Sequence, residues 1–319
     1  MTVPGIHHVT AITGDVQRTV DFHVGVLGLR LLKKTVNFDV PDTYHLYFGD
    51  LVGTPGTAIT FFGWPFLPWR PQGNGQVRLI SYAVPARSIE YWAGRLRGHG
   101  LEVRREERFG SEVLAFSDAE RFQLELVGDG VDDRWVPWTE SPVEAEFQVR
   151  GFHSVGLGLR ETESSARFLV ETLGFRELGS EAGRKRCVTH AGGPGAIVDL
   201  ISDPGRPDGE EGAGTVHHVA WRALDDAHQL VLRQSLIEAG REVTPVIDRK
   251  YFHSIYFREP GGVLFEIATD GPGFTVDETI EDLGSGLQLP PQAEGRRQDL
   301  IFNLPPIIVP GQGGRRTAE

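Results

Sequence analysis

The chain repeats one pattern four times, and this internal repeat limits the possible folds more than any other feature of the sequence. Each copy begins with an alternating apolar strand, continues with an amphipathic helix and ends with three short strands. The opening strands are IHHVTAIT (6–13), VRLISYAVP (77–85), FHSVGLGLR (152–160) and VHHVAWRA (216–223). The pattern predicts an α+β protein made of four βαβββ modules.

The ends of the modules also align. Each helix-like stretch stops at a glycine, which suits the left-handed residue that ends a helix; these are Gly28, Gly100, Gly174 and Gly240. The closing strands are TAITFFG (57–63), RFQLELVGD (121–129), AIVDLISD (196–203) and VLFEIATD (263–270). Two such modules can curl their sheets toward each other, with helices outside and a concave pocket within. Four modules are therefore expected to form two curled-sheet pockets.

The length of 319 residues suits about two domains. We expect an N-terminal pair of modules at 1–132, a Pro-rich and acidic linker at 133–149, and a C-terminal pair at 150–272. Residues 273–319 contain paired prolines, which argue against a long helix or a central strand. This segment is predicted to be an extended tail that wraps over the body.

Charge and composition favour a small-molecule partner. The formal net charge of −12 disfavours nucleic acid or an anionic membrane surface as the main partner. A single cysteine, Cys187, excludes an internal disulfide framework and is interpreted as a structural or surface thiol. With no leader-like segment and no long apolar run, we expect a cytoplasmic location; a homo-oligomer stays open.

The strand alternation selects one histidine from each His-His-Val motif. Successive strand residues face opposite sides, so only one histidine of a pair is expected to point into a pocket. In the third module His153 shares its face with apolar residues, which leaves Ser154 on the pocket side. His8 and His218 occupy the same position in their modules as Ser154, so they are predicted to point inward.

The same parity turns Glu266 of the last closing strand into a pocket; its equivalents are Thr60, Glu125 and Asp199. Two imidazoles and one carboxylate with open coordination positions are typical of the facial triad of non-haem Fe(II) enzymes that activate oxygen. Mn, Zn or Ni also accept such ligands. The alternative is a pair of core histidines beside a salt-bridged glutamate. Glu125 and Asp199, with no inward histidine beside them, are interpreted as structural.

With these motifs, the chain resembles the vicinal oxygen chelate (glyoxalase/bleomycin resistance/dioxygenase) superfamily. Within it, the chain resembles the dioxygenases that cleave the rings of hydroquinones and chlorohydroquinones. The resemblance covers essentially the whole chain and rests on GIHHVTAIT, TVHHVAWR, DRKYFHSIYFREPGGVLFEIATDGPGF and LGSGLQLPP. It implies Fe(II) bound by His8, His218 and Glu266, with a small aromatic diol and O2 as substrates.

The chain departs from two other branches of that superfamily. The catechol-cleaving branch places its first ligand histidine where this chain has Ser154, and glyoxalases have a fourth ligand where it has Thr60. A site that uses His8 with His218 and Glu266 requires the first and last modules to share a pocket.

Four further residues are candidates for catalytic roles. Arg249 matches a pocket arginine of the hydroquinone enzymes and could hold an anionic phenolate; the alternative is a surface cation. Tyr256 resembles the family tyrosine beside the metal, or is a half-buried sheet aromatic. Thr10 shares the inward face of His8 and could bind a ligand oxygen. For His217, alternation predicts the helix side, yet the resemblance implies an acid–base role that a bulge would permit.

Other residues have weaker assignments. His7 is expected to pack behind the sheet or to orient a ligand. Trp64, Phe66 and Trp69 could line or cover the pocket, whereas His23, His45, His190 and His253 are interpreted as ordinary histidines. Two other functions stay open. One is a glyoxalase-like metal-dependent lyase or isomerase acting on a thiol adduct, and the other is a non-catalytic protein that binds an aromatic toxin.

Overall fold

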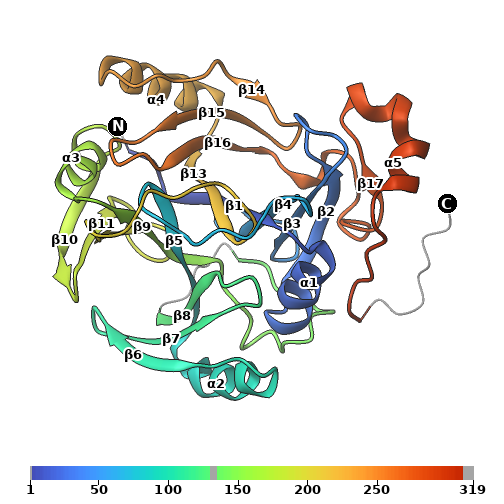
Figure 1. Cartoon of the computed structure of the whole chain (residues 1–319), viewed down its shortest axis with the longest axis horizontal. Coiled ribbons are helices and arrows are strands. Elements are labelled where there is room, and N and C mark those ends of the chain that lie inside the picture. Colours follow the sequence, from blue (N-terminus) through green and yellow to red (C-terminus); the bar gives the residue numbers. More distant parts are fainter. Residues whose placement is uncertain (1, 130–134, 312–319) are drawn as a thin grey trace.

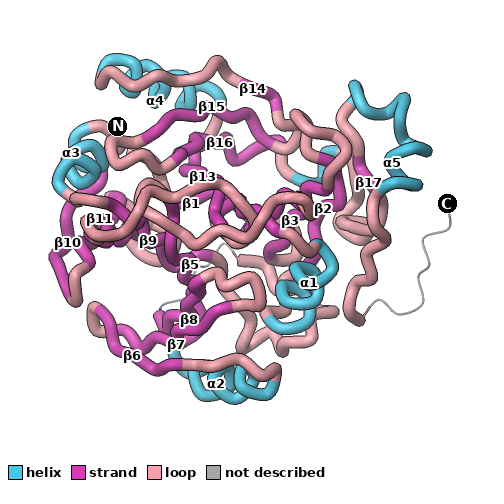
Figure 2. Tube along the Cα trace, viewed as in Figure 1, coloured by secondary structure: helices cyan, strands magenta, loops and turns pink. Residues whose placement is uncertain are grey.

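The computed structural model of the chain describes residues 2–129 and 135–311. Figure 1 shows strands gathered in the middle of the molecule and helices at its edge, and the tube in Figure 2 marks the same division by colour. In the described part of the chain, no helix is long and apolar enough to cross a membrane.

Each module contributes four strands. They are β1 (Ile6–Thr13), β2 (Arg30–Val36), β3 (Tyr44–Gly49) and β4 (Ala58–Gly63); β5 (Gln76–Pro85), β6 (Arg104–Arg108), β7 (Ser111–Ser117) and β8 (Gln123–Asp129); β9 (Phe152–Leu159), β10 (Phe175–Glu181), β11 (Arg184–Thr189) and β12 (Ile197–Ser202); and β13 (Thr215–Ala223), β14 (Ile247–Asp248), β15 (Phe252–Arg258) and β16 (Leu264–Pro272). The opening and closing strands of each module lie side by side and parallel. The predicted βαβββ repeat is confirmed.

One helix follows the opening strand of each module. These helices are α1 (Val16–Val20), which continues as the π-helix η1 (Asp21–Val26); α2 (Ile89–Gly98), preceded by η2 (Ala86–Ser88); α3 (Glu163–Glu171); and α4 (Asp226–Glu238). Asp15 and Asp225 begin α1 and α4, because each carboxylate accepts a backbone N–H of the first turn. The four predicted stop glycines all have a positive φ, as the C-terminal position of a helix requires.

The modules combine into two curled sheets in an order that differs from their order along the chain. The first and last modules, together with the short tail strand β17 (Leu287–Gln288), form a nine-stranded sheet in the order β14-β15-β16-β13-β1-β4-β3-β2-β17. The two middle modules form an eight-stranded sheet, β10-β11-β12-β9-β5-β8-β7-β6. The antiparallel pair β1–β13 joins the two ends of the chain. The expectation that the first and last modules share a pocket is therefore confirmed.

The apolar faces of both sheets and the helices form one large core. Val9, Val219, Phe265 and Ile267 belong to this core and alternate with the pocket-side residues of their strands. Residues 135–149, within the segment predicted as a linker, contain no helix or strand. Residues 133 and 134 of that linker lie outside the described residues, and the domain boundaries stay a prediction.

The tail is less extended than its prolines suggested. It contains η3 (Phe274–Val276), β17 (Leu287–Gln288), η4 (Pro291–Arg296) and α5 (Arg297–Asn303), and it runs beside the nine-stranded sheet (Figure 1). Strand β17 adds to β2 at the edge of this sheet. The prolines border the short helices rather than exclude them, because Pro291 occupies a first helical position, where its missing N–H costs nothing.

Candidate metal centre

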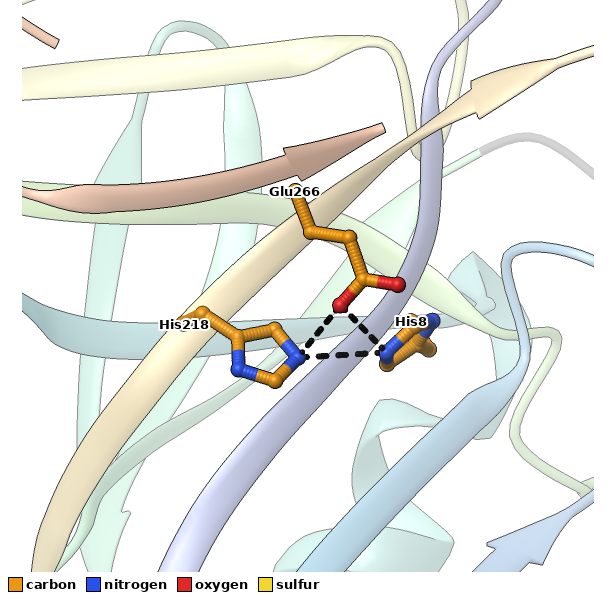
Figure 3. A group of neighbouring side chains, drawn as sticks. All are labelled: His8, His218 and Glu266. Carbon is orange, nitrogen blue, oxygen red and sulfur yellow. Dashed lines mark hydrogen bonds and ion pairs between the residues drawn. The ribbon is translucent and has the colours of Figure 1, made fainter. Parts of the chain in front are cut away.

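Three ligand-type side chains converge on the concave face of the nine-stranded sheet. His8 from β1, His218 from β13 and Glu266 from β16 point at one another (Figure 3). His8 Nε2 lies 3.3 Å from His218 Nε2 and 3.5 Å from Glu266 Oε2, and His218 Nε2 lies 2.8 Å from the same oxygen. All three residues are buried.

The strand register explains how residues far apart in the sequence meet. His8 lies opposite Ala220 on β13, and Ala220 lies beside Glu266 on β16. His218 is two residues from Ala220 on the same face of β13. The small methyl group of Ala220 thus sits among the three longer side chains and leaves the space above it free for their ends.

The local chemistry fits a divalent cation. Glu266 Oε1 accepts a hydrogen bond of 2.5 Å from Ser254, but Oε2 is buried and accepts no hydrogen bond of normal geometry, although His218 Nε2 is close. Burying a carboxylate oxygen without a hydrogen-bond donor costs free energy of folding, and a bound cation would offset that cost. Burial opposes the ionisation of Glu266, but His8 and His218 outweigh it and lower its pKa well below the usual value. An ionised carboxylate with two imidazoles suits Fe(II), Mn, Zn or Ni.

Each ligand histidine is hydrogen-bonded to the histidine before it. His7 Nδ1 lies 2.9 Å from His8 Nδ1, and His217 Nδ1 lies 2.7 Å from His218 Nδ1. A histidine that binds a metal through Nε2 carries its proton on Nδ1 and donates it to a neighbouring acceptor. His7 and His217 are in the position to accept these protons and so to fix the rings of His8 and His218.

Two β-bulges make this pairing possible. The register of β1 and β13 shifts between Ile6 and His8 on one strand and between His218 and Val216 on the other, so that His7 and His217 are each the extra residue. A bulge interrupts the alternation of side chains. The expectation that only one histidine of each pair can face the pocket is therefore wrong for His217, which lines the cavity together with His218.

The candidate metal centre opens into a cavity of about 290 Å³. A cavity of roughly 150 Å³ is enough to hold benzene, so one substituted aromatic ring fits here. The lining residues are His8, Thr10, Asn37, Phe38, Asp39, Val40, His45, Tyr47, Phe62, Trp64, His217, His218, Arg249, Phe252, Tyr256, Leu264 and Glu266. All the predicted site residues thus line one cavity, whereas Phe66 is 94% exposed and Phe66 and Trp69 are not part of its wall.

Arg249 and Tyr256 form one polar side of the cavity. Tyr256 lies opposite Glu266 in the β15–β16 pair, and its hydroxyl accepts a hydrogen bond of 3.3 Å from Arg249 Nε. Burial would lower the pKa of Arg249, but Tyr256, Asp39 and Glu266 outweigh it and raise the pKa, so the guanidinium stays charged. Burial raises the pKa of Tyr256, which remains a neutral phenol. The alternative of Arg249 as a surface cation does not hold, since its side chain is only 21% exposed.

Sequence reasoning missed His45, Tyr47 and Ser254. His45 and Tyr47 lie on β3 and line the cavity, and Ser254 on β15 holds Glu266. A signal existed in the alternation of β3, where His45 and Tyr47 share a face; Tyr47 lies opposite Thr60, whose inward direction was predicted. The pairing of β3 with β4 depends on the turn between them, which alternation does not determine.

The equivalent face of the eight-stranded sheet is closed by ion pairs. Arg186 binds Asp199 through two hydrogen bonds of 2.7 and 2.8 Å, while Arg108, Arg184 and Ser81 surround Glu125. These contacts agree with the structural interpretation of Glu125 and Asp199. Among the described residues, only the group His8, His218 and Glu266 brings three potential metal ligands together.

Comparisons with known proteins agree with this fold and site. The sequence profile of the glyoxalase/bleomycin resistance protein/dioxygenase superfamily matches residues 5–140 and 151–267. A candidate ring-cleaving dioxygenase of Bacillus subtilis, MhqO, is 44% identical over 306 residues, which is 96% of this chain and 97% of that protein. The chlorohydroquinone/hydroquinone 1,2-dioxygenase of Sphingobium indicum is 35% identical over 322 residues, 96% of this chain and 98% of that protein.

Solved structures show the same relationship. The crystal structure of a candidate dioxygenase from Bacillus subtilis superposes with a TM-score of 0.91 at 43% identity, and the match covers 97% of this chain and 98% of that one. Glyoxalase I from Zea mays shares the fold at 14% identity, with a TM-score of 0.59 over 83% of this chain and 92% of that one. The chain therefore belongs to the glyoxalase/bleomycin resistance protein/dioxygenase superfamily, and its full-length relatives mark it as an enzyme of the ring-cleaving dioxygenase group.

Proposed function

We propose that this protein is a non-haem Fe(II)-dependent, extradiol-type dioxygenase that cleaves the ring of hydroquinone-like aromatic diols. The observation that carries the proposal is the unsatisfied Glu266 Oε2, which lies among the Nε2 atoms of His8 and His218 at the base of a cavity of ring size. A facial set of two histidines and one carboxylate leaves coordination positions open for a substrate oxygen and O2, and bound Fe(II) would supply the electron transfer between them.

The cavity residues have separate tasks in this proposal. Arg249 compensates the charge of a phenolate oxygen, since the guanidinium is held charged beside Tyr256. Phe62, Trp64 and Phe252 exclude water and pack on the faces and edges of the ring. Desolvation and the neighbouring His218 lower the pKa of His217 to about 3, so this ring is a neutral imidazole. Its Nδ1 accepts from His218, which leaves the Nε2–H to donate a hydrogen bond to a substrate oxygen.

The donor set argues against a glyoxalase-like lyase or isomerase. Thr60, where those enzymes have a fourth ligand, hydrogen-bonds to His45 and Thr10, both at 2.9 Å. Its hydroxyl is therefore committed to other residues of the chain. A protein that only sequesters an aromatic toxin would have no need of three converging ligands.

The decisive test is anaerobic loading with Fe(II), followed by oxygen-electrode measurements with methylhydroquinone, chlorohydroquinone and catechol. We expect uptake of O2 with the two hydroquinones and only in the Fe(II)-loaded protein. Glu266→Gln should lower the rate by more than about a hundredfold, because loss even of a residue that orients a metal ligand costs 10–100-fold. Asp270→Asn is the matched control on the same strand, where the carboxylate pairs with Arg222 away from the cavity, and it should stay fully active.

Other outcomes would contradict the proposal. Full O2 uptake by Glu266→Gln would exclude Glu266 as a ligand. Turnover of a thiol adduct with Ni or Zn and no uptake of O2 would instead support the lyase. Cytoplasmic location remains a prediction, and a homo-oligomer stays open.

A further inference from the structure

A line of hydrogen bonds runs across the cavity wall and ends beside the candidate metal centre. The Tyr47 hydroxyl lies 2.9 Å from His45 Nδ1, His45 Nε2 lies 2.9 Å from Thr60 Oγ1, and Thr60 Oγ1 lies 2.9 Å from Thr10 Oγ1. These groups come from the three neighbouring strands β3, β4 and β1. Thr60 and Thr10 are fully buried, and Tyr47 is only 2% exposed.

The strand register places this line on the row that contains His218. Tyr47 pairs with Thr60 across β3 and β4, Thr60 with Thr10 across β4 and β1, and Thr10 with His218 across β1 and β13. Cross-strand neighbours on one face are about 5 Å apart. The Thr10 residue is therefore a direct neighbour of a candidate metal ligand, and it lines the same cavity.

The direction of donation along this line follows from the two aromatic groups at its far end. Burial raises the pKa of Tyr47 well above its usual value, so its hydroxyl keeps its proton. Burial, with His8 and His218 nearby, lowers the pKa of His45 well below 6.5, so its ring is neutral and carries one N–H. A buried phenol O–H requires an acceptor, and His45 Nδ1 lies beside it. His45 then donates from Nε2 to Thr60, and Thr60 donates to Thr10.

We propose that His45 is a positioning residue for the reaction: it commits the Thr60 hydroxyl as a donor to Thr10, so that the Thr10 O–H donates to an oxygen atom bound beside His218. This inference rests on the proposed function. A donor aimed at an oxygen that gains negative charge stabilises it most where water is excluded, as in this buried corner of the cavity. Without His45, Thr60 can also donate away from Thr10, and the Thr10 proton has no fixed direction.

The kinetic test compares His45→Gln, His45→Leu, Thr60→Val and the double variant His45→Leu/Thr60→Val in the Fe(II)-loaded protein with methylhydroquinone. Removing a single transition-state donor costs roughly 10²–10³ in kcat; His45 acts through two hydroxyls, so we expect a loss of about tenfold in His45→Leu and in Thr60→Val, with KM changed less than about twofold. His45→Gln retains an N–H donor and should recover most of the rate. His253→Gln, on the same sheet and paired with Asp226, is the control and should match the wild type.

The double variant separates positioning from simple packing. If His45 acts through Thr60, the double variant loses no more kcat than Thr60→Val alone, because the two changes break one line of hydrogen bonds. Losses that multiply, or a fully active His45→Leu variant, would overturn the proposal. So would a His45→Gln variant as impaired as His45→Leu, since only the volume of the imidazole would then matter.

A second measurement does not depend on activity. Long-range proton–nitrogen NMR spectra of the metal-free protein, with the His45 signals assigned through His45→Gln, should show the proton on Nε2, and Tyr47→Phe should shift the tautomer toward Nδ1–H. A wild-type proton on Nδ1 would overturn the proposed direction of donation. A wild-type protein that consumes no O2 with any hydroquinone removes the proposed function itself. An active wild type with a fully active His45→Leu variant removes only the role of His45.

Discussion

In each His-His pair the second histidine points to the candidate metal position and the first hydrogen-bonds to its far nitrogen. The contacts are equivalent in β1 and β13, and each depends on a bulge at the first histidine. Phe252 also packs against the rings of His7 and His8, with centroids 5.1 and 4.9 Å apart. The ring orientation of the ligands is therefore set by their own sequence neighbours as well as by the core.

At this scale we predict that His7→Leu or His217→Leu weakens metal binding by about 10–100-fold, the usual effect of removing a group that orients a metal-ligating histidine. Competition between the protein and a chromophoric chelator for Zn2+ measures the affinity. The control is His153→Leu, because His153 is the equivalent bulge histidine of the eight-stranded sheet and hydrogen-bonds Ser154. An affinity unchanged in His7→Leu and His217→Leu, or equally reduced in His153→Leu, would contradict an orienting role.

Strand alternation predicts the positions of some site residues and not of others. His8, His218 and Glu266 were identified because alternation within four aligned repeats places them on one face. Alternation alone turned His217 to the helix side, because a bulge depends on how two strands pair and leaves no local pattern in either strand; the resemblance, which required a bulge, agrees with the cavity position of His217. His45 was missed for the same reason: its distance from Thr60 depends on the register of β3 against β4.

At the scale of elements, the tail is held to the nine-stranded sheet by buried charges. Lys33 on β2 is fully buried and pairs with both Asp277 and Glu278, and Asp277 also binds Lys250 and the Tyr251 hydroxyl. These contacts seat Phe274 against the rings of Tyr47 and Tyr251, at centroid distances of 5.3 Å in each case. The tail thus packs behind the part of the cavity wall to which Tyr47 belongs.

The tail prolines exclude a long helix, as predicted, but they also mark where a short helix begins, which was not predicted. The composition of the tail predicts an extended segment over the body. It does not identify the contact that holds this segment, which is the buried Lys33 paired with Asp277 and Glu278. A lysine in a strand is ordinarily exposed. Its burial follows from tertiary contacts with a segment more than two hundred residues away, which local patterns do not contain.

We predict that attachment of the tail is sensitive to acid through Asp277. Burial opposes the ionisation of Asp277, but Lys250 and Lys33 outweigh it and lower the pKa below the ordinary 3.8. A lowered carboxyl pKa gives a contribution to stability that is complete above the ordinary pKa and is lost as pH falls through the folded pKa. The wild type should therefore lose stability as the pH falls below the ordinary carboxyl pKa of 3.8, and Asp277→Asn should be less stable at pH 7 and less sensitive to acid.

Chemical denaturation at a series of pH values measures both effects. At pH 7 the loss in Asp277→Asn should be about 1–3 kcal/mol, since Lys33 keeps Glu278 as a partner. Asp299→Asn, an exposed carboxylate in α5, serves as the control and should behave as the wild type. An Asp277→Asn variant with the wild-type acid profile would show that other groups cause the acid sensitivity.

For the whole molecule, the decisive feature is that neither half of the chain contains a complete sheet. The first and last modules form one sheet and the middle modules form the other, so each half of the sequence supplies strands to both. The ligands follow the same division, with His8 in the first module and His218 and Glu266 in the last. Repeat analysis alone predicts the modules; the pairing of modules one and four came from the requirement that these three residues meet.

This arrangement predicts one cooperative unfolding transition in calorimetry rather than two, because opening the β1–β13 pair disrupts the sheet to which both ends of the chain contribute. It also predicts that metal stabilises the whole chain, since its three ligands join strands of the first and last modules. At a free metal concentration 100 times the Kd, stability should rise by about 2.7 kcal/mol, which raises Tm by roughly 4 °C for a chain of this size. Glu266→Gln should lose this shift and Asp270→Asn should keep it. Two separated transitions, of which only one responds to metal, would mean that the two sheets unfold independently and would contradict a single cooperative unit.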